Sequence, residues 1–239
     1  EGGQPAPLHT KLAGSYMVYN LLAVYAAAST IGCSAEDAQR AMDAFDPKNG
    51  RLQEYVVDGR RTLLNLAKNP TGFNQNLRIV AEGEGPRGVA FFINDQVVDG
   101  RDISWIWDID FEELVSQPGL VVFAGGSRRN DLQVRLKYAG VKAQLVDGIE
   151  DVFAALAKLG GQDGGAGAVR AGAGAEDSFP ADAPVYAIAN YSALPPVKAK
   201  LDAMATGEGA LGEGGVVAAR GGVAAADAAG VEAGAGAEA

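Results

Sequence analysis

The fold is decided by the stretch GVAFFINDQVVDGRDISWIWD, which runs from Gly88 to Asp108. Its first six residues, Gly88 to Ile93, form an apolar run that predicts a buried strand. Asp95 follows just beyond the carboxyl end of that strand, and open α/β sheets bind their ligands at this edge. The spacing therefore predicts that Asp95 lies where the sheet meets a ligand or a partner.

The rest of the stretch is a loop that holds four acids and both tryptophans of the chain within fifteen residues. Aromatic groups are costly to leave in water, so we expect the loop to pack against other groups and to direct its acids to a site or a partner. The alternative is a loop anchored by two core tryptophans, with acids that are only solvated. Asp108 likewise has two interpretations, a catalytic carboxylate or a cap for the local backbone.

The composition excludes several classes of function. A net charge of −10 and a pI near 4.6 argue against binding to nucleic acid, which requires a basic surface. The single Cys33 excludes an internal disulfide and a multi-cysteine metal site, and no metal ligands are assigned. The single His9 leaves no histidine partner for a serine or cysteine nucleophile except from another protein. Any acid–base chemistry therefore falls to carboxylates.

The location expected from the sequence is the cytoplasm. The sequence contains no stretch long and apolar enough to be a transmembrane segment. The first residues lack the charged and then apolar pattern of a signal peptide.

The order of the expected elements predicts an α/β fold with a doubly wound, mostly parallel sheet. Strands are expected over residues 51–57, 62–67, 88–93, 120–124, 141–145 and 184–189, with Asp58-Gly59 as a hairpin turn between the first two. Helices are expected over residues 15–31, 34–45, 70–80, 130–139, 149–159 and from about 195 to 204. The helix at 15–31 is apolar almost all round, which predicts burial. Asn20 within it needs a hydrogen-bond partner or a ligand.

Three stretches together resemble the Mur ligase family. Residues 14–54 contain GSYMVYNLLA, Gly32, Phe45 and GRLQE, which are similar to the end of the central ATP-binding domain of these enzymes. The following block resembles the C-terminal domain of one branch, the Mur-ligase-like subunit of lipid II isoglutaminyl synthase, through KNPTG (68–72), Asn94-Asp95, DGRD (99–102), SWIWD (104–108), RLKYAG (135–140) and YSAL (191–194). The match covers roughly residues 12–204 outside the Gly/Ala-rich part.

The resemblance implies a domain organisation. Residues 1–57 would comprise a leader and a helical remnant of the central ATPase domain, and residues 58–204 a Rossmann-like α/β domain. Residues 160–182 are a Gly/Ala run that we expect to be a flexible insertion, and residues 205–239 an acidic, disordered tail.

The resemblance also implies a reaction. ATP, with Mg²⁺, would activate the α-carboxyl of D-glutamate in lipid II as an acyl phosphate, and ammonia from a glutaminase partner would convert it to D-isoglutamine. Asp95 is the first candidate for the catalytic acid and Asp108 the second. Asn20 would face the adenine, and Arg51 the ribose or the phosphates.

Lys68 and Asn69 are candidates for cofactor binding for a different reason. They lie in a strand-loop-helix turn with a proline near the helix start, where free backbone N–H groups can receive an anion. The alternative for Lys68 and Asn69 is that they only shape that turn. Arg51 and Asn20 also have alternatives: Arg51 could be an exposed strand residue, and Asn20 could make a hydrogen bond in helix packing.

The chain departs from the family pattern in ways that limit its function. The Gly-rich phosphate loop with its lysine is absent, so we expect the chain to be a C-terminal fragment that is inactive alone. Met17 stands where the family usually has an asparagine. Where conventional Mur ligases show an Asp-Tyr-Ala-His-x-Pro type motif, this chain has Asn65-Leu-Ala-Lys68-Asn-Pro70. The charge there has changed from acidic to basic, which would suit ammonia as the nucleophile. The alternative function is a non-catalytic docking module for the glutaminase, and a third is a free-standing nucleotide-binding domain.

Overall fold

The computed structural model describes residues 7–10, 16–45, 50–160 and 179–205. The α-helices are α1 (Tyr16–Thr30), α2 (Ala35–Asp43), α3 (Pro70–Ala81), α4 (Arg129–Tyr138), α5 (Ile149–Gly160) and α6 (Leu194–Met204). The strands are β1 (Gln53–Val57), β2 (Arg60–Leu66), β3 (Arg87–Phe92), β4 (Leu120–Gly125), β5 (Ala143–Leu145) and β6 (Val185–Ala189). Three short 3₁₀ helices, η1 (Val97–Asp99), η2 (Ser104–Asp108) and η3 (Phe111–Leu114), lie between β3 and β4.

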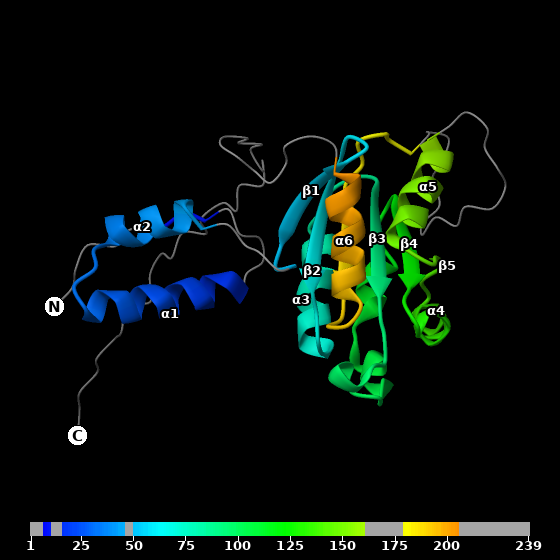
Figure 1. Ribbon diagram of the computed structural model, residues 1–239, viewed down its shortest axis with the longest axis horizontal. Helices are drawn as coiled ribbons and strands as arrows, with labels where there is room; N and C mark the ends of the chain where they lie inside the picture. Colours follow the sequence, from blue (N-terminus) through cyan, green and yellow to red (C-terminus); the bar gives the residue numbers. More distant parts are fainter. Residues whose placement is uncertain (1–6, 11–15, 46–49, 161–178, 206–239) are drawn as a thin grey trace, which may run out of the picture. The chain divides into compact units, whose positions relative to one another are not determined.

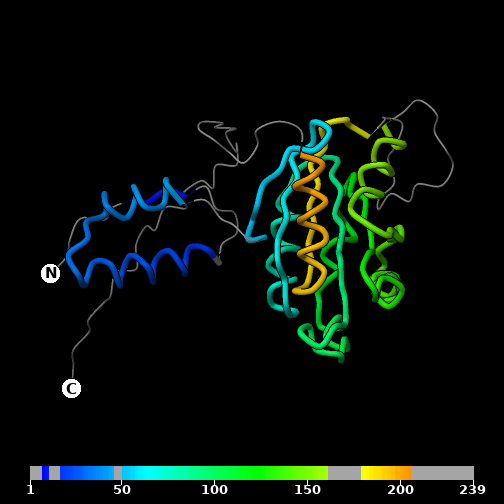
Figure 2. Tube along the Cα trace, viewed as in Figure 1, coloured from blue at the N-terminus to red at the C-terminus, as the bar shows by residue number. Residues whose placement is uncertain are grey.

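The six strands form one sheet in the order β1-β2-β6-β3-β4-β5 (Figure 1). All neighbours are parallel except β1 and β2. The sheet therefore confirms the expected α/β, mostly parallel, Rossmann-like fold. The last strand in sequence, β6, lies between β2 and β3, so residues distant in sequence meet at the centre of the sheet (Figure 2).

The antiparallel edge is a tight hairpin. Asp58 and Gly59 have positive φ values of 50° and 76°, as a two-residue type I′ turn requires. The hairpin predicted from Asp58-Gly59 is therefore confirmed. Because β1 belongs to the same sheet as β2, the expected boundary between residues 57 and 58 falls inside the hairpin.

Two apolar cores cover the two faces of the sheet. One contains Phe92, Phe123, Val185 and side chains of α5 and α6, and Figure 1 shows α6 lying along this face. The other contains Phe91, Val122 and Ile188 together with side chains of α3, α4 and the 3₁₀ helices. Strands covered on both faces need apolar side chains in both directions, which explains the continuous apolar runs of β3 and β4. All six residues of each of these strands are buried.

The prediction that the first helix is buried is wrong. Val18, Tyr19, Leu22 and Val24 of α1 are 51%, 76%, 56% and 62% exposed. Among the described elements, α1 packs mainly on α2. A single short neighbour cannot cover a helix that is apolar on every side.

The segment expected to be a flexible insertion is packed at both ends. Gly160 is the last residue of α5, and Phe179 is buried in the core shared with α5 and α6. The buried Arg60 side chain donates hydrogen bonds to the carbonyl oxygens of Pro180 (2.7 Å) and Ala183 (3.2 Å). The expected range of 160–182 was therefore too wide. Its interior (161–178) lies outside the described residues, and so does the expected disordered tail (205–239) apart from Ala205.

Candidate functional site

The carboxyl ends of four parallel strands meet at one edge of the sheet, because β2, β6, β3 and β4 run in the same direction. The residues that follow them are Lys68 after β2, Asn190 after β6, Asn94 and Asp95 after β3, and Ser127 and Arg128 after β4. Asp95 therefore lies just beyond the carboxyl end of β3, as expected, at the edge where open α/β sheets bind their ligands.

Asn94 is the centre of a hydrogen-bond network at this edge. Its backbone N–H donates to Oδ1 of Asn190 (3.1 Å), and its carbonyl oxygen accepts from Nδ2 of Asn190 (2.8 Å). Its side-chain Oδ1 accepts from the backbone N–H of Ser127 (2.8 Å). Asn94 therefore ties the ends of β3, β4 and β6 together.

Asp95 is held by the turn between β4 and α4. Ser127 Oγ donates to Oδ1 of Asp95 (2.9 Å), and Arg128 Nη1 donates to Oδ2 (3.0 Å). Arg128 Nε also donates to Asp131 (2.9 Å), so one guanidinium bridges two carboxylates. The hydrogen bond from Ser127, followed by that from Arg128, lowers the pKa of Asp95 below its ordinary value. With about a third of its side chain exposed, Asp95 is an ionised hydrogen-bond acceptor that other molecules can reach.

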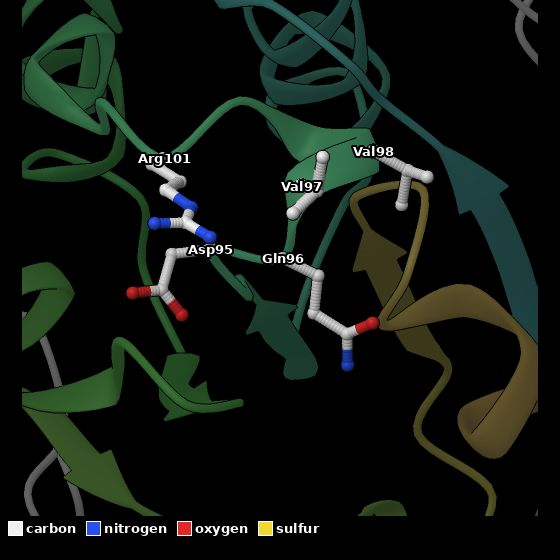
Figure 3. A pocket seen from close by; sticks show the side chains of 5 residues that line it. All are labelled: Asp95, Gln96, Val97, Val98 and Arg101. Carbon is white, nitrogen blue, oxygen red and sulfur yellow. The ribbon is translucent and has the colours of Figure 1, made fainter.

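A surface cavity of about 590 Å³ opens beside Asp95. It is lined by Asp95, Gln96, Val97, Val98 and Arg101, whose side chains Figure 3 shows. Val97 and Val98 are 74% and 64% exposed. The cavity therefore combines an anionic group, a cationic group and exposed apolar surface.

The other acids of the loop have different surroundings. Asp99 accepts hydrogen bonds from the backbone N–H (2.9 Å) and the hydroxyl of Ser192, and Asp102 accepts from the backbone N–H of Ser104 (2.8 Å). Asp108 is exposed at the end of η2 and does not line the cavity. The structure therefore brings Asp95, and not Asp108, to the cavity.

The two tryptophans of the loop differ in burial. Trp105 packs on Phe73, with ring centroids 5.5 Å apart, against one of the cores. Trp107 is 51% exposed and contacts the Tyr138 ring at 5.6 Å. The alternative of a loop anchored by two core tryptophans therefore holds for Trp105 only.

Arg51 and Lys68 lie at the same edge as Asp95. Arg51 precedes β1, whose register places Gln53 opposite Leu64, so Arg51 lies beside the carboxyl end of β2. Both cations are exposed, and Lys68 Nζ lies 4.6 Å from the centre of the Tyr191 ring. The edge therefore carries positive groups that could face an anion.

The remaining cofactor candidates are placed differently. Asn69 is the N-cap of α3, and its Oδ1 accepts from the Gly72 N–H (2.8 Å), so its side chain shapes the turn. Asn20 is exposed on α1, with its Nδ2 3.8 Å from Met17 Sδ. The hydrogen bond that its side chain makes is thus to another residue of α1.

Within the described ranges, no group of three or more His, Cys, Asp or Glu residues could hold a metal ion. No described helix is long and apolar enough to cross a membrane.

Replacing Arg128 with Gln is expected to raise the pKa of Asp95 toward 3.8, because the carboxylate loses a hydrogen bond and a neighbouring positive charge. Because the pKa of Asp95 is lower in the folded protein, its contacts stabilise the fold at a pH above the pKa that Asp95 has in the unfolded chain. That contribution is lost as the pH falls through the folded pKa. An NMR titration of the Asp95 carboxyl carbon measures the change. Lys137→Gln, which removes an exposed cation from the same helix, is the control, and an equal shift in both variants would contradict the assignment.

Sequence reasoning missed Asn190, Ser127 and Arg128 as parts of the site. Each lies within three residues of the carboxyl end of a strand of the parallel sheet, so position alone offered a signal. Their convergence on Asn94 and Asp95 depends on the strand order, in which β3 lies between β6 and β4.

Comparisons with known proteins agree with this geometry. A family model described as MurT ligase C-terminal matches residues 66–194. The lipid II isoglutaminyl synthase (glutamine-hydrolyzing) subunit MurT of Staphylococcus aureus (strain COL) is 36% identical over 149 residues, which are 62% of this chain and 34% of that protein. This chain therefore spans about a third of the length of that relative.

Two solved structures share the fold at low identity. UDP-N-acetylmuramate-alanine ligase MurC of Thermotoga maritima has a TM-score of 0.53 and 14% identity, over 85% of this chain and 40% of that chain. The folylpolyglutamate synthase of Mycobacterium tuberculosis, complexed with ADP and AMPPCP, has a TM-score of 0.52 and 16% identity, over 81% and 41%. The family model covers more than half of the residues and includes the edge that carries Asp95. The chain therefore belongs to the MurT ligase C-terminal family.

Proposed function

We propose that this chain is the C-terminal part of an ATP-dependent ligase subunit that amidates the α-carboxyl of D-glutamate in lipid II. The observation that carries the proposal is the 36% identity with a subunit named lipid II isoglutaminyl synthase (glutamine-hydrolyzing). The matched family model spans the edge where Asp95 faces a cavity. Because the chain matches only 34% of that relative, we assign the activity to the complete ligase and expect the chain alone to be inactive.

The proposed reaction has two steps. ATP, when bound, supplies the phosphoryl group that converts the α-carboxylate to an acyl phosphate. The nitrogen of ammonia then attacks the carbonyl carbon, the C–O bond to phosphate breaks with its electron pair, and the nitrogen loses a proton. The products are the amide, inorganic phosphate and ADP, which leaves when the phosphoryl group is transferred from ATP to the carboxylate.

The residues of this chain would orient the reactants. Asp95 is held ionised, so it can accept a hydrogen bond from the N–H of the incoming ammonia, or from a partner group, and fix its direction. Asp108 is a second candidate for this role. Arg51 and Lys68 place positive charge at the same edge, where they favour the phosphates of ATP. Asn69 keeps the α3 N-terminus capped, and Asn20 faces the adenine.

A folylpolyglutamate synthase with this fold was solved with ADP and AMPPCP, which supports ATP as the cofactor. Mg²⁺ would be held mainly by the phosphates of ATP, as is usual for this ion in nucleotide sites. We assign α1 and α2 to the central ATPase domain, and we place the start of the C-terminal domain at Gln53 instead of residue 58, because β1 belongs to its sheet. The cytoplasm is the proposed location.

The proposed partner is a glutaminase subunit that supplies the ammonia, since the relative is named a subunit of a glutamine-hydrolyzing enzyme. A second candidate function is a docking module for that subunit without a part in the chemistry. The exposure of Val97 and Val98 beside Asp95 favours it, because exposed apolar side chains are commonly used for protein contacts.

The acyl phosphate route predicts the fate of one oxygen atom. When lipid II carries ¹⁸O in the D-glutamate α-carboxyl, the complete ligase with its glutaminase is expected to release phosphate that contains one ¹⁸O per amide formed. Mass spectrometry of the released phosphate measures its ¹⁸O content. A control with γ-¹⁸O-labelled ATP and unlabelled lipid II shows that ¹⁸O in the phosphate is detected. Amide formation with unlabelled phosphate would exclude this route.

A further inference from the structure

We propose that Asn190 is a positioning residue, which sets the direction of the Asp95 carboxylate by clamping the backbone of Asn94. The inference rests on the role proposed for Asp95. Asn190 itself touches no reacting group in this scheme.

The clamp consists of three hydrogen bonds between the ends of β6 and β3. The Asn190 backbone N–H donates to the Phe92 carbonyl oxygen (3.0 Å). Its side chain then accepts from the N–H of Asn94 (3.1 Å) and donates to the carbonyl oxygen of Asn94 (2.8 Å). With Asn190 only 2% exposed, these bonds are shielded from water. The backbone immediately before Asp95 is therefore fixed in position.

A second set of contacts holds the Asp95 side chain, and it comes from the turn after β4, the strand on the other side of β3. The Asn94 side chain accepts from the Ser127 N–H, and the Ser127 hydroxyl donates to Asp95. The Arg128 N–H also donates to the carbonyl oxygen of Ile93 (3.0 Å). Asp95 therefore has its side chain held by β4 and its backbone held by β6, and loss of either set would change its direction.

The chemistry of the clamp requires an amide. A donor and an acceptor must face the C=O and the N–H of one residue at the same time, and a carboxamide carries both on one planar group. Aspartate cannot donate, so Asn190→Asp would place a carboxylate oxygen against the Asn94 carbonyl oxygen. Alanine would leave both backbone groups without this partner.

The turn after β6 makes a second set of hydrogen bonds to the loop that contains Asp95. Two residues after Asn190, the N–H and the hydroxyl of Ser192 donate to the Asp99 carboxylate. The Gln96 N–H donates to the same carboxylate (3.2 Å). The turn between β6 and α6 is therefore bonded to residues on both sides of Asp95, and these bonds restrain the exposed loop.

The test uses the complete ligase with its glutaminase and the variants Asn190→Ala, Asn190→Asp, Asp95→Asn and Asn190→Ala/Asp95→Asn. Because small misplacements of a reacting group are costly, we expect Asn190→Ala to lower kcat by about 10- to 100-fold with little change in KM for lipid II. Asn190→Asp should be at least as damaging. The double variant should be no slower than Asp95→Asn alone, because Asn190 acts through Asp95.

The control is Asn76→Ala, which removes another buried amide, one that bonds to Asn65 and Gly72. Asn76→Ala should lower the melting temperature by about as much as Asn190→Ala does, and it should leave kcat unchanged. Hydrogen exchange gives a readout that does not need activity. Amides of residues 94–101 should exchange faster in Asn190→Ala and at the original rate in Asn76→Ala.

The outcomes separate the two proposals. If Asp95→Asn is fully active, the role proposed for Asp95 fails, and the positioning role fails with it. If Asp95→Asn is inactive but Asn190→Ala has normal kcat, or exchange at 94–101 is unchanged, only the positioning role is overturned. A double variant much slower than Asp95→Asn also overturns it.

Discussion

Replacing Asp95 with Asn is expected to lower the rate of lipid II amidation by about 100-fold or more, the loss typical when a preorganised electrostatic group is removed. The substitution keeps the size of the side chain and removes its charge. The amide oxygen of asparagine can still accept from the Arg128 guanidinium, and its NH2 group can donate to the Ser127 hydroxyl oxygen, so both contacts of the side chain are retained. The effect therefore reports the ionised carboxylate and not the packing of the loop.

The measurement is product formation by the complete ligase with its glutaminase, with gel filtration of the same samples. Asp147→Asn is the matched control. Asp147 pairs with Arg129, the residue after Arg128, and its side chain is 84% exposed. Normal product from Asp95→Asn would exclude a role in the chemistry. Loss of product together with loss of the complex would favour the docking module.

Replacing Gly126 with Ala is expected to destabilise the fold by about 3 kcal/mol or more, from backbone strain and a steric clash together. Gly126 has φ +88°, and a Cβ there would lie 2.4 Å from the carbonyl oxygen of Ile93. That oxygen accepts the Arg128 N–H. Relief of the clash must move the backbone just before Asn94 and Asp95, so activity should fall as well.

Urea unfolding measures the change in the free energy of unfolding. Gly85→Ala is the control, because Gly85 also has a positive φ, of +73°, but a Cβ there would have no atom within 4 Å. It should cost about 1 kcal/mol, the strain of the left-handed conformation alone. Equal losses in the two variants would show that the contact with Ile93 can relax and does not constrain the site.

Short-range patterns in the sequence determined the elements of the fold. The apolar run before Asn94 is a buried strand, Asp58-Gly59 is a tight hairpin turn, and Ser34 caps α2 through a capping box with Asp37. Each of these structures depends on residues within a few positions of one another. The alternation of strands and helices likewise sufficed for the fold class, and position after a strand sufficed to place Asp95 at the ligand edge.

Only the tertiary structure decided what surrounds Asp95. Its partners Ser127 and Arg128 lie 32 and 33 positions away, and Asn190 lies 96 positions from Asn94. These residues meet because β3 lies between β6 and β4, a strand order that local patterns do not contain. The same limit explains the exposure of α1 and Trp107: an apolar side chain is buried only where another element covers it, and coverage depends on the whole arrangement of the chain.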